Sequence, residues 1–505
     1  MTIPAPTVEY SVVAPMLLVF GTAVAAVAVE AAVGPRRRFG VQLVMCAAAL
    51  VAALITVIAL AGTHQRAVMG ALAIDGPALF AQGLILVVAL LVLLLIAQGR
   101  SGGLTPQGAA IPGSADEQAA LRAGAVQTAV FPLLMFAVGG MMLFPAADDL
   151  LTMFVALEVF SLPLYVLCGL ARRRRVLSQE AALKYFLLGA FSSAFFLYGI
   201  AMLYGATGTM SLAGIGAHVE RTPTVLLGVG LLTVGVLFKI GAIPFHAWIP
   251  DVYQGAPTSV TAFMAAATKI AAFGAMLRIF YVALPELRDD WRPVLSGVAM
   301  LTMVLGAVFA VGQTDMKRLL GYSAVAQAGF LMLGVVAANA AGITSTLFYL
   351  AAYGVCVIGA FAVVGLVRTA DGSGEEASEI SSWAGLGRRS PMLALAFALF
   401  LLAFAGIPLT SGFAGKFAVF QAAADGGAVL LVVVGVLASA VAAVVYARVI
   451  LLMFFSEPAA DAPHIVMPSR LTAVAITAAA AVTLAVGILP QPLLDLADRA
   501  GGFVT

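Results

Sequence analysis

The sequence contains few charged residues, few cysteines and none of the short motifs of nucleotide or metal sites. Asp, Glu, Lys and Arg make up 10% of its 505 residues and hydrophobic residues 63%, whereas a typical soluble domain has about 25% charged residues. The three cysteines, Cys46, Cys168 and Cys356, stand singly and far apart, which argues against a metal or iron–sulfur site. No glycine-rich phosphate loop follows a strand pattern. The composition therefore predicts a membrane protein without a redox or nucleotide site of its own.

Neither sign of charge is in excess, because the 26 basic and 24 acidic residues give a formal net charge of only +2. A chain that binds nucleic acid usually carries a strong basic excess. We therefore expect the lipid bilayer, and not nucleic acid, to be the surroundings of this protein.

Apolar runs long enough to cross a bilayer recur along the chain and predict an all-α, polytopic transmembrane helix bundle. About fourteen spans are expected, at 10–31, 40–61, 77–98, 125–146, 149–170, 180–204, 223–250, 257–282, 293–312, 318–338, 341–368, 391–423, 427–455 and 471–494. The longest polar segments between them, 99–124 and 369–390, are predicted to be loops.

The loops on the two sides of the membrane differ in basic residues. Alternate loops, which include Arg36–Arg38, Arg172–Arg175 and Arg388–Arg389, hold 15 of the 26 basic residues, and the opposite loops hold 5. Basic loops stay in the cytoplasm as a rule. We therefore expect a multi-pass protein with both termini on the outer side.

Lysine is rare, since only 5 of the 26 basic residues are lysines. Lys184, Lys239, Lys269 and Lys416 fall inside predicted spans, and only Lys317 lies at a loop edge. A charge at the bilayer centre costs about 2.5–3.5 kcal/mol on insertion scales, so stability does not explain this placement. Buried lysine can release its proton, whereas arginine stays charged. The pattern indicates groups that bind and release protons, while Lys317 fits an ordinary loop charge that sets orientation.

Each buried lysine also has a structural explanation, because it could pair locally or extend to the membrane surface from a helix end. This alternative applies most to Lys184, which lies near the end of its span. Glu158 is the only acidic residue in the middle of a span, and Lys184 is on the following span. We expect these two residues to form an ion pair. Arg278, nearer a span end, is expected to be structural.

Two predicted spans are interrupted near a lysine. A Gly-Ala-Ile-Pro run follows Lys239 in the seventh span, and a Gly-Ile-Pro run precedes Lys416 in the twelfth. Such breaks free backbone carbonyls, which is typical of ion pathways, although glycine and proline are also common in transmembrane helices generally. His246 follows the first break and is expected to relay protons between Lys239 and Lys269; a packing role is the alternative.

The spacing of the two breaks predicts an internal repeat. They lie five spans apart, which suggests two inverted five-helix repeats formed by spans 4–8 and 9–13. The chain then divides into an N-terminal three-helix segment (1–124), a first repeat (125–282), a second repeat (283–455) and a C-terminal helix (456–505).

Several stretches resemble the antiporter-like membrane subunits of respiratory complex I, over nearly the whole chain. They are 238–258, Leu157–Glu158, Gln313–Arg318 and Gly412–Phe417. Within that family, Ala182–Ala190 and a lysine on the twelfth span are most similar to the subunit N branch.

The resemblance implies roles in proton translocation at the matching positions. These are Glu158 and Lys184 as a glutamate–lysine pair, Lys239 as the central lysine, His246 and Lys269 as a relay, and Lys416 as the terminal lysine. Gln327 departs from the pattern, since histidine is frequent there in relatives and glutamine cannot titrate.

The resemblance also implies partners and an energy source. This chain would be a membrane subunit of a proton-pumping NADH–quinone oxidoreductase, beside the antiporter-like subunit M and the small membrane subunits. FMN, iron–sulfur clusters and quinone are expected in other subunits, with no cofactor in this chain. Two alternatives stay open, a subunit of a cation/proton antiporter and a passive scaffold within the complex.

Overall fold

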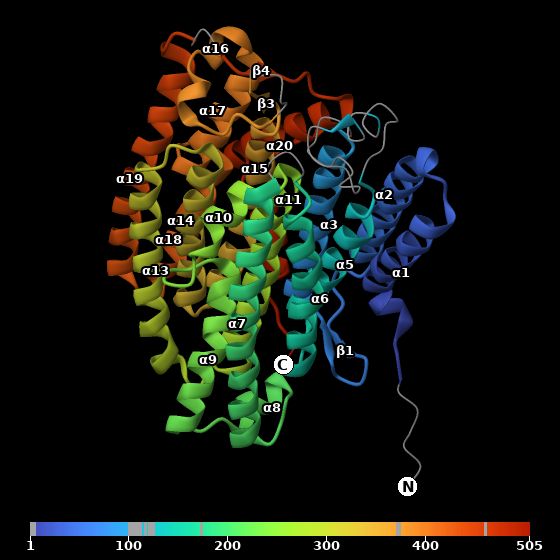
Figure 1. Ribbon diagram of the computed structural model, residues 1–505. Helices are drawn as coiled ribbons and strands as arrows, with labels where there is room; N and C mark the ends of the chain where they lie inside the picture. Colours follow the sequence, from blue (N-terminus) through green and yellow to red (C-terminus); the bar gives the residue numbers. More distant parts are fainter. Residues whose placement is uncertain are drawn as a thin grey trace.

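Apolar helices that run alongside one another form most of the molecule (Figure 1). The computed structural model describes residues 7–98, 114–115, 119, 127–171, 175–369, 375–458 and 462–504. Most of the expected loop 99–124, part of 369–390, and the basic residues Arg100, Arg122 and Arg172–Arg174 lie outside the described residues.

The helices of the first half of the chain are α1 (Tyr10–Ala32), α2 (Pro35–Ala59), α3 (Gly76–Ile96), α5 (Val130–Leu143), α6 (Leu150–Cys168), α7 (Arg175–Thr207), α8 (Leu212–His218), α9 (Pro223–Ile240), α10 (Trp248–Gly255), α11 (Thr258–Phe263) and α12 (Lys269–Arg278). Those of the second half are α13 (Arg288–Val311), α14 (Met316–Ala337), α15 (Ala340–Val364), α16 (Leu386–Arg389), α17 (Pro391–Ala405), α18 (Ser411–Asp425), α19 (Val429–Phe455), α20 (Arg470–Ile488) and α21 (Gln491–Arg499). Acceptor side chains mark several starts: those of Asp75, Asp149 and Asp315 accept backbone N–H groups of α3, α6 and α14.

Twelve described helical segments are long and apolar enough to cross a membrane, and Val130–Ala146 and Pro391–Ala405 are shorter apolar helices. One of these segments corresponds to each predicted span, so the prediction of an all-α, polytopic bundle of about fourteen spans is confirmed. α11 and α12 form one span, Thr258–Ala283, joined by a π-helical turn at Met264–Thr268.

The two ends of the bundle are distinct in Figure 1. The short antiparallel strands β1 (Gln65–Ala67) and β2 (Leu72–Ile74) lie with α8 toward one end, which we call the hairpin end. α16 and the strands β3 (Val367–Arg368) and β4 (His464–Ile465) lie at the opposite end, which we call the α16 end. The span formed by α11 and α12, together with α14 and α15, is buried nearly throughout, while α7, α13 and α19 expose large apolar side chains.

A buried ionic cluster closes the hairpin end of α12. Arg278 is 0% exposed; its Nη2 lies 2.6 Å from Asp75 Oδ1, and its Nε donates to the Pro145 carbonyl at 2.8 Å. Its Nη1 lies 4.0 Å from Asp148 Oδ1, and Arg66 pairs with the other oxygen of Asp148 at 2.7 Å. Burial raises the pKa of the Asp148 carboxyl, although the two arginines oppose this effect. The expectation that Arg278 is structural agrees with these contacts.

A second buried cluster lies at the α16 end, where Lys317 lies in the first turn of α14. Lys317 is 1% exposed; its Nζ donates to the Ala256 carbonyl at 2.7 Å and lies 3.1 Å from Glu376 Oε2. Glu376 also lies 3.8 Å from Arg368. The expectation that Lys317 is an ordinary loop charge is therefore wrong. The reason is tertiary: Met316 N–H donates to the Ser378 carbonyl at 2.6 Å, which folds the 375–380 segment over the start of α14.

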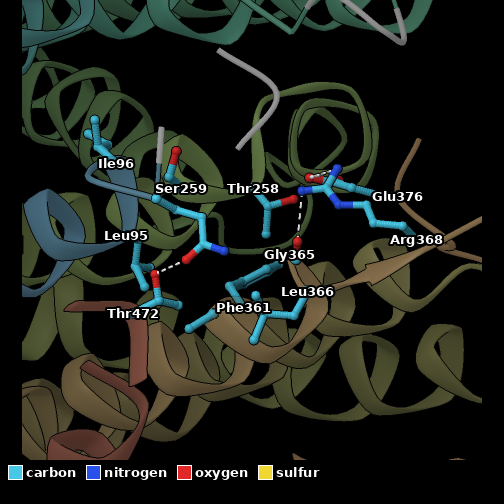
Figure 2. Close-up of a pocket in the computed structure, with 12 residues that line it drawn as sticks. Leu95, Ile96, Thr258, Ser259, Phe361, Gly365, Leu366, Arg368, Glu376 and Thr472 are labelled. Carbon is cyan, nitrogen blue, oxygen red and sulfur yellow. Dashed lines mark hydrogen bonds and ion pairs between the residues drawn. The ribbon is translucent and has the colours of Figure 1, made fainter. Parts of the chain in front are cut away.

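Figure 2 shows the small cavity beside this cluster. Its volume is about 40 Å³, and its polar lining includes Gln98, Ser259, Arg368, Glu376 and Thr472. This volume leaves room for about two or three water molecules at the end of the bundle.

Loss of the Asp75 charge should destabilise the hairpin end. Asp75→Asn keeps an acceptor for the start of α3 but leaves Arg278 buried beside a neutral side chain, at a cost of about 3–5 kcal/mol. We expect less of this protein in the membrane and a lower unfolding temperature, measured by quantitative immunoblot and thermal unfolding. Asp290→Asn is the control, because its partner Arg221 is 73% exposed and such pairs contribute about 0–1 kcal/mol. Equal losses in both variants would contradict the assignment.

Glu376→Gln should destabilise the protein to the same extent across the neutral range. Burial raises the pKa of Glu376, but the charges of Lys317 and Arg368 outweigh it and hold the pKa at about 2, below the ordinary 4.5. Because this pKa is lowered, the ionised Glu376 carboxylate stabilises the folded state by about 3 kcal/mol at any pH above its ordinary pKa of 4.5. The stabilisation is lost as the pH falls from 4.5 toward 2. Thermal unfolding at about pH 5.5 and about pH 8 should show the same loss. A loss confined to one pH would show that Glu376 titrates there; Glu457→Gln, an exposed carboxylate, is the control.

Candidate functional site

The first helix break lies at the end of α9. Gly241 follows Ile240 with φ of +76°, a left-handed conformation that glycine adopts without the strain of a side chain, and α10 begins only at Trp248. The end of α9 leaves carbonyls without helical partners. Lys269 Nζ donates to the Ile240 carbonyl at 2.7 Å, and Trp248 Nε1 donates to the Phe238 carbonyl at 3.0 Å. Lys269 is 1% exposed, and its hydrogen bond to the free Ile240 carbonyl holds its side chain at the break.

The second break repeats this arrangement. α17 ends at Ala405, Gly406 follows with φ of +81°, and α18 begins at Ser411. Lys416 Nζ donates to the carbonyls of Phe404 and Ala405 at 2.8 and 3.0 Å and to Ser439 Oγ at 2.8 Å. The prediction that the seventh and twelfth spans are broken is confirmed, and a lysine lies at each break.

Lys239 is buried among aromatic rings two residues before Gly241. It is 2% exposed, and its Nζ donates to Ser161 Oγ at 2.7 Å. The ring centroids of Phe160, Tyr185 and Tyr165 lie 5.3, 5.4 and 5.6 Å from this nitrogen, within the range of cation–π attraction. Lys239 thus sits in an aromatic cage with one hydroxyl partner.

Three of the four buried lysines share one property. Over the described ranges, no carboxylate lies within ion-pair distance of Lys239, Lys269 or Lys416. Their partners are neutral hydroxyl and carbonyl oxygens. Lys317, in contrast, has Glu376 beside it. The structure therefore separates lysines with a fixed counter-charge from lysines without one.

Glu158 and Lys184 do not pair in this structure. Lys184 Nζ lies 2.5 Å from Asp251 and 2.6 Å from Glu180, and its side chain is 40% exposed. Glu158 lies one turn before Ser161 on α6, and its Oε1 is buried without a hydrogen-bond partner among the described residues. The expected Glu158–Lys184 ion pair is wrong for this conformation, because α10 places Asp251 against α7 and supplies Lys184 with a nearer anion.

His246 lies in the break between α9 and α10, half buried. Its ring packs near Phe309 on α13 and Tyr322 on α14, with centroids 6.1 and 6.2 Å away. Its Nδ1 has no hydrogen-bond partner in the described part of the chain, and no hydrogen bond in that part links it to Lys239 or Lys269. The relay role of His246 stays a prediction.

A polar bridge reaches Lys416 from α14 and α15. Gln327 Nε2 donates to the Phe404 carbonyl at 3.0 Å, and Lys416 donates to the same oxygen. The Tyr349 hydroxyl donates to Gln327 Oε1, and the Tyr349 ring lies directly against Gly415, the neighbour of Lys416. Gln327 therefore connects the second break to the α14–α15 interface.

The same stretch of α15 extends toward Lys269. Ile270, next to Lys269, packs against Gly354. The buried Tyr353 hydroxyl has no hydrogen-bond partner among the described residues, and its ring centroid lies 6.0 Å from that of Phe404. α15 thus lies between the two lysine sites.

Several residues of this site were not predicted from the sequence. They are the hydroxyl residues Ser161, Tyr349, Tyr353 and Ser439 and the cage residues Phe160, Tyr165 and Tyr185. Tyr349 and Tyr353 carried a usable signal, because two tyrosines four residues apart share one face of the apolar segment 341–368. Ser161 and Ser439 carried none, since single serines are common in transmembrane helices.

Nothing in the described ranges forms a metal-ligand set of three or more His, Cys, Asp or Glu side chains. Cys46, Cys168 and Cys356 are buried and free. The placement of FMN, iron–sulfur clusters and quinone in other subunits stays an expectation.

Comparison with known proteins places these features in a family. Residues 147–442, more than half of the chain, match the family described as NADH:quinone oxidoreductase/Mrp antiporter, TM. NADH-quinone oxidoreductase subunit N of Rhodococcus opacus (strain B4) is 61% identical over 529 residues, covering 99% of this chain and 97% of the relative.

Two solved structures have similar chains. One, from respiratory complex I of Thermus thermophilus with bound aureothin, has a TM-score of 0.79 and 34% identity and covers 97% of this chain and 100% of its own. Another, from the Mrp complex of Dietzia sp. DQ12-45-1b, also has a TM-score of 0.79 and covers 97% of both chains, but its 23% identity supports the fold alone. These similarities favour complex I over a cation/proton antiporter. The chain belongs to the antiporter-like membrane subunits of NADH-quinone oxidoreductase, and among them to the subunit N family.

Proposed function

We propose that this chain is a proton-translocating subunit of a NADH–quinone oxidoreductase in a bacterial plasma membrane. Electron transfer from NADH to quinone, through FMN and iron–sulfur clusters in other subunits, supplies the energy. The observation that carries the proposal is a set of three buried lysines, two of them at helix breaks, that have no carboxylate partner among the residues the structure describes. The neighbouring antiporter-like subunit M and the small membrane subunits are the partners that couple it to that chemistry.

Neutral partners make these lysines suitable proton carriers. A carboxylate beside a buried lysine stabilises its charge strongly, and breaking such a pair costs about 3–5 kcal/mol. Carbonyl and hydroxyl oxygens accept hydrogen bonds from an ammonium group and from a neutral amine alike. Lys239 and Lys269, with one such acceptor each, therefore keep their hydrogen bonds in both protonation states, and Lys416 as a neutral amine with two N–H groups keeps two of its three. A modest change in the nearby field then suffices to move a proton.

The proposed path follows the contacts along the bundle. Protons reach Lys239 from the cytoplasm and pass to Lys269, whose Nζ binds the carbonyl of Ile240, the neighbour of Lys239. They continue along α15, by way of Tyr349 and Gln327, to Lys416. Because glutamine cannot titrate, this last part of the path requires water or the tyrosine hydroxyl as the carrier. His246 serves as a second relay at the first break.

The gate proposed for this path involves Glu158 and Lys184. Glu158 lies one turn from Ser161, which binds Lys239, so the charge of Glu158 alters the proton affinity of Lys239. In this structure Lys184 is held by Asp251 and Glu180. Movement of Lys184 toward Glu158 would neutralise that carboxylate and favour release of the proton from Lys239.

The proposed orientation places the basic α16 end in the cytoplasm and both termini outside. Arg368, Arg388 and Arg389 lie at the α16 end, and α1 begins toward the hairpin end (Figure 1). Protons then leave on the outer side after Lys416.

Lys239→Ala tests whether the chain carries protons. We expect NADH-driven acidification of inverted vesicles to fall by about tenfold or more, because no other described side chain occupies the aromatic cage. Arg388→Ala, an exposed arginine at the α16 end, is the control and should pump normally. Unchanged pumping in Lys239→Ala, with normal assembly, would contradict the proposal and support a passive scaffold role for this chain.

Lys416→Arg separates titration from charge. Arginine keeps the positive charge and can bind the Phe404 carbonyl but does not release its proton, so pumping should fall by about tenfold or more. The reverse exchange Arg448→Lys, on exposed α19, is the matched control and should have no effect. Pumping and assembly are measured together in the same vesicles. Full pumping by Lys416→Arg would exclude Lys416 as a carrier.

A further inference from the structure

A long apolar crevice lies between α2 and α3, away from the lysine sites. Its part toward the hairpin end has a volume of about 610 Å³, and its part toward the other end has a volume of about 450 Å³. The two parts adjoin at Val87, which lines both. On α3 the crevice extends from Gly76 to Leu94, about 27 Å along the helix axis, close to the thickness of a bilayer's hydrocarbon core of about 30 Å.

Small residues keep the crevice open. Ala47 of α2, Gly83 of α3 and Ala351 of α15 line it, and the larger lining side chains are leucine, isoleucine, valine and phenylalanine. A Cβ atom at Gly83 would meet only Val57 Cγ1, at 3.6 Å, an ordinary van der Waals distance, so the missing side chain leaves a gap beside Val57 of α2. The walls therefore suit an extended apolar occupant.

The mouth of the crevice at the hairpin end is basic. Arg499, the last residue of α21, and His64 line it, and both side chains are exposed. In the described part of the chain, no carboxylate lies within ion-pair distance of Arg499, and no acidic residue lines either part of the crevice. An arginine without a counter-charge at the edge of an apolar slot is complementary to an anion with an apolar tail.

The helix at this mouth, α21, has one apolar face and one polar face. Leu493 and Leu496 face the crevice, while Gln491 and Asp495 bond each other on an exposed surface. An amphipathic helix of this kind is suited to lie in the plane of the headgroups, which would place Arg499 near the lipid phosphates.

We propose that the α2–α3 crevice binds one anionic phospholipid. Its acyl chains lie between α2 and α3, and its phosphate accepts hydrogen bonds from the Arg499 guanidinium and the His64 imidazole. One guanidinium group can donate two parallel hydrogen bonds to a single phosphate, which favours Arg499 as the headgroup site. A quinone would suit the walls but would leave Arg499 without an anion.

The bound lipid would act as a structural filler. α2 packs on α3, and α3 packs on α11 and α12, the span that carries Lys269. Filling the crevice would hold the α1–α2 pair against the span that carries this lysine.

Photolabelling of the intact complex tests the proposal. The complex is reconstituted in phosphatidylcholine vesicles that contain phosphatidylglycerol with a diazirine on one acyl chain, irradiated, and mapped by mass spectrometry. We expect adducts on α2 and α3 at crevice residues such as Ile58 and Leu84. Labelling of the exposed Phe191 on α7 is the internal reference for bulk lipid.

Matched variants decide the outcome. Arg499→Gln should lower crevice labelling, relative to Phe191, by about fivefold, the effect of one basic residue near a lipid surface, and Arg499→Lys should retain it. Gly83→Leu should lower it by filling the slot, whereas Arg388→Gln should not change it. Absence of crevice adducts, equal labelling in Arg499→Gln, or displacement by ubiquinone but not by phosphatidylglycerol would overturn the proposal. None of these readings depends on proton pumping.

Discussion

The structure depends on the contact between a buried lysine ammonium and the backbone carbonyls freed where a helix is broken. In hydrocarbon neither group is stable alone, because unpaired carbonyls and unpaired charges both lack water. Lys269 at Ile240 and Lys416 at Phe404 and Ala405 satisfy both requirements at once. The left-handed glycines Gly241 and Gly406 end the two helices, and the lysines in turn stabilise the breaks.

The cations inside this bundle fall into two groups with different partners. Arg278 and Lys317 lie beside carboxylates at opposite ends of the bundle, where they join segments far apart in the sequence. Among the described residues, Lys239, Lys269 and Lys416 have only neutral oxygens and aromatic rings for partners. A paired charge is held permanently, whereas a charge solvated by neutral dipoles can be gained and lost. The division between structural and transporting residues is thus a division between kinds of partner.

The bridge that leads to Lys416 is formed by an amide and a tyrosine hydroxyl, Gln327 and Tyr349, and not by a series of lysines, histidines or carboxylates. Gln327 and Lys416 share the Phe404 carbonyl, and Tyr349 donates to Gln327. An amide oriented at both ends holds its neighbours in a fixed arrangement without carrying a net charge. The α15 segment that contains Tyr349 and Tyr353 thereby becomes part of the site.

The membrane class, the spans, the two breaks and the rare lysines can be recognised from the sequence alone, because hydrophobic length and the Gly–Pro pattern are local properties. The aromatic cage of Lys239 and the link through Tyr349 were decided by tertiary structure. So was the pairing of single charges. Lys317 is buried because Glu376, 59 residues later, folds back over it, and Lys184 turns from Glu158 because α10 brings Asp251 to α7. A side chain's environment is set by elements distant in sequence, and burial and counter-charges decide whether a lysine is a fixed charge or a proton carrier.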